Sequence, residues 1–399
     1  MPSTRKTFYQ YLGLHSLLIG IFPFYIPVYI WKQGFGVGEI SLFIALAGLG
    51  FCGALWVWDR LRFRVNLTGL IGVSLFLEIL LLYNVHVMQM SRPILLVLGI
   101  TYGLYNCFYW TTQRALFFDL IDLESSGKKY GNFQIFVGIL LQLGILMGAF
   151  LLERTNFVLL VWASAVIAVV GFFIVIRTRP LYPVTLSRHA SLTIRDILGF
   201  RDNENSRLVF VIDGLFLFAE SFFWLITLFM LAHESFTTLG LMVLSLAVIF
   251  GILFFLLKNT IDRLGRKHVY ILAVGLYALS WALRAITDND YSLEILFLLL
   301  VVITFSTSFF RLAMNKRFYD IAKLTRSHDY LVLKSYYTQM AIVVVFGTLG
   351  FAVLEIPDSE VVLGPVYWAC AVLAFLYLLY GTSRYNGECP RSRAERPLP

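Results

Sequence analysis

Two carboxylates lie within one long apolar segment of the sequence. The stretch VIDGLFLFAESFFW places Asp213 and Glu220 seven residues apart. On a helix this spacing brings both side chains to one face, with Trp224 one turn further along. A buried carboxyl group can exchange protons near neutral pH, so Glu220 and then Asp213 are our first candidates for a proton-exchange site. The alternative is that one or both only hydrogen-bond to neighbouring helices.

Other apolar segments also carry polar groups. His15 can titrate at physiological pH or merely donate a hydrogen bond to a backbone carbonyl. The stretch YGLYNCFYWTTQR repeats polar-tipped aromatic and amide side chains at helical spacing, at Tyr102, Tyr105, Asn106, Tyr109 and Gln113. This stripe suits the wall of a wet cavity that binds a small organic solute, or an aromatic packing face. Further candidates for the same wall are Trp224, Thr304, Thr307, Arg311 and Gln142. No role follows for Glu78, which lies in the middle of another apolar segment.

Arg114 and Arg311 lie near the expected ends of two apolar segments. If their side chains reach a cavity, they favour an anionic solute. If they extend towards the membrane interface or pair there with carboxylates, they carry no information about a solute. The sequence leaves both interpretations open.

The composition indicates that these segments cross a lipid bilayer. The chain has 399 residues, of which 59% are hydrophobic and only 14% charged, with a mean hydropathy of +0.78. Soluble domains carry about 25% charged residues, and a bilayer-spanning helix needs roughly 20 mainly apolar residues. We expect an all-α integral membrane protein with twelve transmembrane helices, at 8–31, 38–58, 67–88, 93–113, 132–152, 157–177, 208–231, 237–257, 269–286, 293–313, 336–354 and 361–382.

The distribution of positive charge predicts the orientation. Most lysines and arginines lie in alternate connections, whereas the opposite connections hold only Lys32, Arg92 and Arg154. Lysine and arginine collect in cytoplasmic loops, so both termini are expected in the cytoplasm. The net charge of +8 is thereby explained without nucleic acid. The expected layout is a six-helix bundle at 1–177, a cytoplasmic linker at 178–206, a second six-helix bundle at 207–382 and a cytoplasmic tail at 383–399. Within the linker, SLTIRDILGF could form an amphipathic helix on the membrane surface.

The two halves of the sequence repeat each other weakly. WDRLRFR and IDRLGRK follow the second and eighth predicted helices, FFDLI and FYDIA end the fourth and tenth, and GAFLLE and GFAVLE end the fifth and eleventh. The separation between matched residues is nearly the same in all three pairs. This indicates two parallel copies related by an axis along the membrane normal.

With six helices on each side of a linker, and with DRLGRK between the eighth and ninth helices, the chain resembles the major facilitator superfamily of secondary transporters. The first-half copy, DRLRFR, departs from the family motif because Arg62 stands in place of a glycine. The resemblance implies two pseudo-symmetric six-helix bundles that transport a solute by alternating access. It also implies a central cavity lined by helices 1, 4, 7 and 10.

The basic turns of the two halves could form a cytoplasmic gate. Asp262 can sit at a helix N-terminus, where the macrodipole favours negative charge. Its arginine neighbours could pair with Asp320, and Asp119 could pair with Arg60 or Arg64. The expected gate residues are Asp59, Arg60, Arg64, Asp119, Asp262, Arg263, Arg266 and Asp320. The alternative is that these cations only follow the rule that positive loops face the cytoplasm.

We therefore expect a secondary active transporter of a small organic solute, coupled to protons through Glu220, Asp213 or His15. GILMGA, with Gly144 and Gly148, is a faint match to an antiporter signature, so a drug or metabolite efflux antiporter is one alternative. A non-transporting sensor or scaffold with this fold is another. An enzyme is not expected, because the six histidines are scattered and hydrolase and phosphate-loop motifs are missing. We expect no metal or other cofactor, a monomer in the inner or plasma membrane, and no nucleic-acid partner.

Overall fold

Helices make up all regular secondary structure in the described part of the chain. The computed structural model describes residues 2–87, 91–120, 126–154, 157–177, 191–261, 267–288, 290–325, 328–356 and 359–381. A helix satisfies its backbone polar groups within its own segment, as a chain surrounded by lipid requires.

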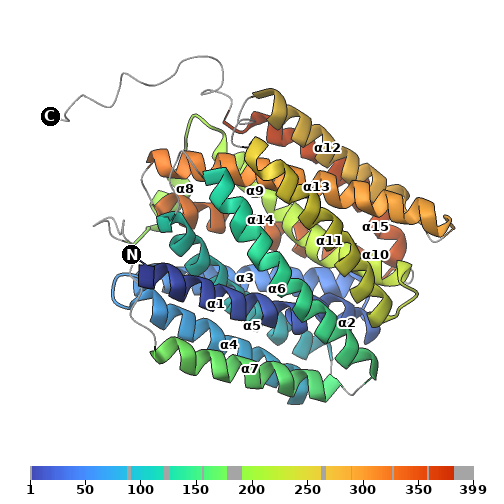
Figure 1. The fold of residues 1–399 in the computed structure, drawn as a ribbon, viewed down its shortest axis with the longest axis horizontal. Coiled ribbons are helices and arrows are strands. Elements are labelled where there is room, and N and C mark those ends of the chain that lie inside the picture. The colour runs from blue at the N-terminus through green and yellow to red at the C-terminus, as the bar shows by residue number, and fades with distance from the viewer. Residues whose placement is uncertain are drawn as a thin grey trace.

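The elements form two groups in Figure 1, one from each half of the chain. The first group holds α1 (Pro2–Ile21), η1 (Pro23–Tyr25), α2 (Ile26–Lys32), α3 (Val37–Leu61), α4 (Leu67–Val87), α5 (Arg92–Leu120), α6 (Ser126–Arg154) and α7 (Phe157–Arg177). The second holds α9 (Ser206–Phe218), η3 (Ala219–Phe223), α10 (Trp224–Leu231), α11 (Phe236–Ile261), α12 (Lys267–Ile286), α13 (Leu293–Thr325), α14 (Asp329–Val353), η4 (Ser359–Val362), α15 (Leu363–Leu373) and η5 (Ala374–Leu379). The short helix α8 (Ile194–Gly199) precedes the second group.

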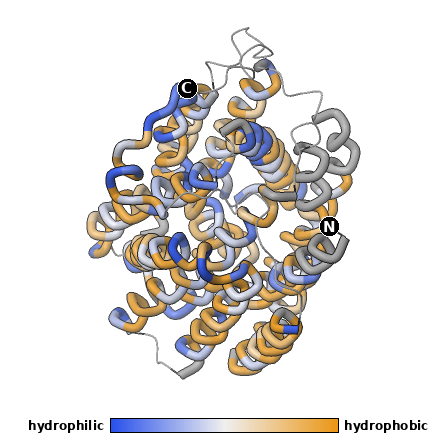
Figure 2. The backbone as a smooth tube through the Cα atoms, turned by 90° about the vertical axis from the view of Figure 1, so that its left-hand side faces the viewer, coloured by the Kyte–Doolittle hydropathy of each residue, from blue (hydrophilic) through white to orange (hydrophobic). Residues whose placement is uncertain are grey.

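The helices have the character of membrane spans. Among the described residues, nine helical segments are long and apolar enough to cross a membrane, and three shorter apolar helices lie at Val158–Ile174, Phe236–Ile249 and Leu363–Leu379. Hydrophobic positions run along most of their length (Figure 2). Large apolar side chains are more than half exposed on the outside, for example Phe76, Trp162 and Val344. The chain is therefore a multi-pass membrane protein, and the count of twelve crossings stays a prediction.

The two halves meet along two helix pairs. α3 packs against α14, and α6 packs against α11. Within the first half, α1 and α6 approach so closely that a Cβ atom at Gly144 would meet the carbonyl oxygen of Leu17, and one at Gly148 would meet that of Ile21. Small residues permit such close helix packing. This contact supports the packing interpretation of GILMGA over the antiporter signature.

Some predicted spans are interrupted, and others are longer than expected; for example, α6 begins at Ser126 and α14 at Asp329. The first span breaks at η1, which begins at Pro23, and the seventh contains the π-helical turn η3. α5 and α13 continue to Leu120 and Thr325, beyond their predicted ends. α8 lies within the predicted amphipathic stretch, and its position on a membrane surface stays a prediction. Residues 178–190 of the predicted linker and the predicted tail at 383–399 lie outside the described residues.

Candidate functional site

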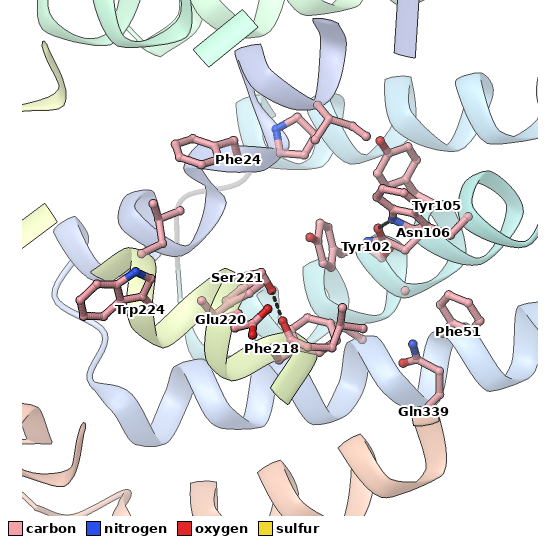
Figure 3. A pocket seen from close by; sticks show the side chains of 18 of the residues that line it. Phe24, Phe51, Tyr102, Tyr105, Asn106, Phe218, Glu220, Ser221, Trp224 and Gln339 are labelled. Carbon is pink, nitrogen blue, oxygen red and sulfur yellow. Dashed lines mark hydrogen bonds between the residues drawn. The ribbon is translucent and has the colours of Figure 1, made fainter. Parts of the chain in front are cut away.

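A cavity of about 460 Å³ lies between the two halves. The first half supplies walls from α1, η1, α3 and α5, and the second half from α9, η3, α10, α11 and α14. Figure 3 shows the open space between these walls, with Tyr102, Tyr105 and Asn106 on one side and Phe218, Glu220 and Trp224 on another. Most lining side chains are aromatic or aliphatic, which suits a solute with a flat apolar body.

The α5 wall is built from side chains spaced by one helical turn. Asn106 donates from Nδ2 to the Tyr102 carbonyl oxygen at 2.8 Å. Its Oδ1 accepts a hydrogen bond of 2.9 Å from the Trp110 indole nitrogen. Arg114 lies one turn further on and also lines the cavity. The predicted aromatic stripe thus faces the cavity through Tyr102, Tyr105 and Asn106.

Glu220 lies in the π-helical turn η3 and is the carboxylate that lines the cavity. The Tyr277 hydroxyl donates to its Oε1 at 2.5 Å. Arg311 donates to its Oε2 from Nε at 3.2 Å and from Nη2 at 2.9 Å. A π-helical turn is rare and is frequent at functional sites. Arg311, which does not line the cavity, thus holds this carboxylate through two hydrogen bonds.

Asp213 lies deeper in the same cluster. Arg311 donates from Nη1 to its Oδ1 at 2.7 Å, and the Lys334 ammonium lies 3.1 Å from its Oδ2. The Tyr377 hydroxyl donates to its Oδ1 at 2.9 Å. One guanidinium therefore bridges two carboxylates, and a second cation completes the charge balance. We call Asp213, Glu220, Arg311 and Lys334 the ionic cluster.

A second buried polar group lies in the first half. His15 Nε2 is 2.7 Å from the Tyr105 hydroxyl, and its ring stacks on Tyr109 with 3.6 Å between centroids. Its Nδ1 lies 3.9 Å from Glu78 Oε2. His15 and Glu78 are almost fully buried, and Tyr105, which hydrogen-bonds to His15, lines the cavity. We call His15, Glu78 and Tyr105 the histidine pocket.

The remaining predicted cavity residues do not line the cavity. Tyr109 and Gln113 are buried, and Thr304 and Gln142 are half-buried. Thr307 accepts a hydrogen bond of 2.9 Å from Arg284, and Arg311 lies behind Glu220. The six predicted residues that do not line the cavity are thus Tyr109, Gln113, Thr304, Thr307, Arg311 and Gln142.

Polar contacts join the halves at the ends of the cavity walls. Arg62 pairs with Asp59 at 2.7 Å in its own half and with Asp329 at 2.9 Å in the other half. Nearby, Arg114 donates from Nη1 to the Ser335 hydroxyl at 3.0 Å, again across the halves. These contacts lie at the end of the bundle where α3 ends and α14 begins.

Comparison with known proteins rests on structure. No family model matches the chain, and no curated protein matches it. The crystal structure of the nucleoside transporter NupG covers 96% of this chain and 100% of its own, with a TM-score of 0.67 and 11% identity. That of the human organic anion transporter MFSD10 (TETRAN) covers 95% and 100%, with a TM-score of 0.62 and 14% identity. The chain has the major facilitator superfamily fold. The predicted all-α fold is therefore confirmed.

The superfamily fold implied that helices 1, 4, 7 and 10 surround the cavity. The first, fourth and seventh do so, as α1 with η1, as α5, and as α9 with η3 and α10. The tenth, α13, contributes Arg311 from behind the carboxylate of Glu220. The ionic cluster is thus a link between the seventh, tenth and eleventh helices.

The predicted gate residues fall in different places. Arg60 stacks on the Trp56 ring at 3.6 Å, and Arg64 is exposed. Asp320 pairs with Lys316 at 2.9 Å on its own helix. Asp262, Arg263, Arg266 and the side chain of Asp119 lie outside the described residues. Asp59 does belong to an ion-pair chain between the halves, but through Arg62.

Several site residues escaped the sequence analysis. Arg62 was noted only as a departure from a motif, yet it bridges the halves. Lys334 lies two residues before the predicted span at 336–354, whereas α14 begins at Asp329 and places it inside the helix as its lone cation. Tyr277 and Tyr377 carried no signal, because tyrosine is common in these helices and only the fold shows what their hydroxyls reach.

Proposed function

We propose that the protein is a secondary active transporter that moves a small organic solute by alternating access. The observation that carries this proposal is the cavity of about 460 Å³ between two bundles, with a carboxylate on its wall. Its size falls within the ordinary range for small-molecule sites. A non-transporting scaffold with the same fold would fill this space with apolar side chains, whereas Asn106, Glu220 and Gln339 face it here.

Protons are the proposed coupling ion, and Glu220 the proposed carrier. It faces the cavity, while its Oε2 accepts two hydrogen bonds from Arg311. Adding a proton to Glu220 removes its charge. Arg311 then keeps an ion pair with Asp213 only. Protonation would therefore loosen the contact between η3 and α13, which belong to different helices of the second half. Asp213 and His15 are the second and third candidates.

Proton flux in reconstituted vesicles tests both statements. The panel includes nucleosides, because NupG is a nucleoside transporter, and organic anions, because MFSD10 is an organic anion transporter. We expect one solute to move protons with the wild-type protein, and Glu220→Gln to abolish this flux while the solute still binds. The matched control is Glu294→Gln, at an exposed carboxylate in the first turn of α13. Normal coupled flux in Glu220→Gln would assign the proton to Asp213 or His15.

The direction of transport gives the second candidate function. An efflux antiporter for a drug or metabolite would show proton flux opposite in sign to that of a symporter in the same assay. The aromatic lining of the cavity favours neither direction. We further propose a monomer in the inner or plasma membrane. Both termini are proposed to lie in the cytoplasm, without nucleic acid as a partner, because lysine and arginine collect in alternate connections.

A further inference from the structure

Two charged side chains line the cavity, and their surroundings differ. They are Glu220 and Arg114. The charge of Glu220 belongs to the ionic cluster, where two cations face two carboxylates. The cluster therefore contributes no net charge to the cavity. Arg114 lies outside the cluster, on the α5 wall.

Arg114 has a neutral partner. Its Nη1 donates to the Ser335 hydroxyl at 3.0 Å, and in the described part of the chain no carboxylate lies within ion-pair distance of it. The residue is half-buried beside an apolar space. An arginine fork matches carboxylate and phosphate oxygens and binds them through two parallel hydrogen bonds. A negative group in the cavity is the partner that this guanidinium lacks.

A second cation adds to the positive potential. Arg284 is 4% exposed and donates to two neutral hydroxyls, at Ser280 and Thr307. Its guanidinium lies 5.1 Å from the ring of Trp224, which lines the cavity. Its Nε is buried and makes no hydrogen bond to the described residues. No carboxylate of the described residues lies within ion-pair distance of Arg284, although Glu220 attracts its charge. Charges interact strongly in a medium of low dielectric constant. The cavity walls therefore favour a negative solute from two sides.

We propose that the solute is an organic anion with a flat apolar body, and that its anionic oxygens bind Arg114 in place of the Ser335 hydroxyl. This inference rests on the proposed transport function and names the class of its substrate. Trp110, one turn before Arg114 on α5, offers a ring to the body of the solute. Because Arg114 and Ser335 belong to different halves, binding the anion releases one of the bonds that hold the halves together.

Matched probe pairs test the proposal by calorimetric titration of the purified protein. The pairs are indole-3-acetate with indole-3-acetamide, 2-naphthoate with 2-naphthamide, and uridine 5′-monophosphate with uridine. We expect the anion of at least one pair to bind ~10-fold more tightly than its neutral partner, because a charge-assisted bond replaces a neutral one. The carboxylate and phosphate pairs show which anionic group the site takes.

The variants separate the role of Arg114 from general attraction of anions. In Arg114→Gln the ratio of the affinity for the anionic probe to that for the neutral probe should fall to about one. The neutral probe should still bind with an affinity within about threefold of that for the wild type. Arg114→Lys should keep part of the preference. Arg92→Gln, which removes an exposed arginine outside the cavity, should keep all of it. Ser335→Ala should tighten anion binding a few-fold, because it removes the competing acceptor.

Three results would overturn the inference. The first is that no anion binds more tightly than its neutral partner. The second is a preference that survives in Arg114→Gln. The third is weaker anion binding in Ser335→Ala. This result would mean that the Ser335 hydroxyl helps to bind the anion instead of competing with it for Arg114. Coupled uptake of a neutral solute alone would overturn the anion class and leave the transport function standing, so the two proposals fail separately.

Discussion

The ionic cluster of the second half and the histidine pocket of the first half hold their buried polar groups in different ways. In the second half, the ionic cluster holds two carboxylates with two cations at 2.7 to 3.1 Å. In the first half, the histidine pocket holds its carboxylate 3.9 Å from an imidazole, with aromatic rings stacked around it. A buried ion pair depends on every partner remaining present. The comparison teaches that the ionic cluster is held by charge pairing, whereas the histidine pocket is held by ring packing and single hydrogen bonds.

The largest expected effect is the loss of the arginine that bridges the cluster. Arg311→Met should lower the free energy of unfolding by about 3–5 kcal/mol, because it leaves the half-buried Glu220 without its cation and removes one of the two cations of the buried Asp213. Thermal unfolding in detergent measures this change. Adding Glu220→Gln in the same chain should recover part of the loss, since the unpaired charge disappears. A double variant as unstable as the single one would show that Arg311 acts through packing rather than charge.

A smaller effect is expected at the carboxylate of the histidine pocket. Glu78→Gln should change the free energy of unfolding by less than about 1 kcal/mol, because the amide keeps the shape and no close ion pair is lost. The same unfolding experiment compares it directly with Arg311→Met. A loss as large as that of Arg311→Met would mean that His15 and Glu78 form a strong ion pair. The two halves would then be alike, and the comparison would fail.

An effect of similar size is expected at the hydroxyl between the pocket and the cavity. Tyr105→Phe removes the 2.7 Å hydrogen bond to His15 and keeps the ring, so we expect a loss of about 0.5–1.5 kcal/mol. Tyr102→Phe is the matched control on the same wall. An equal loss of unfolding free energy in both variants would show that the hydrogen bond to His15 contributes no more than the removal of a hydroxyl from this wall does in general.

The fold was largely accessible from the sequence, because long apolar segments and a weak repeat are strong signals in a membrane chain. The spacing of Asp213 and Glu220 also correctly suggested a shared side of one helix, since both bind Arg311. Arg311 was harder to place, because the tenth span was expected to end at residue 313 and α13 runs to Thr325. A residue expected near a helix end is in fact well inside one. Helix ends are the least predictable feature when polar sequence continues a helix.

The contacts between halves were not accessible in the same way. Arg62 occupies a motif position where a glycine was expected, and nothing local predicts its partner Asp329 in the other half. The π-helical turn at Glu220 likewise has no sequence signal, because it depends on how η3 packs against the neighbouring helices. The Arg62–Asp329 contact and the π-helical turn depend on tertiary packing, so only the structure shows them.

The length of α13 has a mechanical consequence. Its 33 residues extend for about 50 Å, whereas the hydrocarbon core of a bilayer is about 30 Å thick. Arg311 lies about 21 Å from the end of the helix at Thr325. The part of the helix that follows Arg311 is packed against other elements: Arg317 donates to the Gly381 carbonyl oxygen, and the Tyr319 ring packs against Phe117 of the first half. A tilt of α13 where Arg311 binds Glu220 would therefore be passed along the helix to these contacts, one of which lies in the other half.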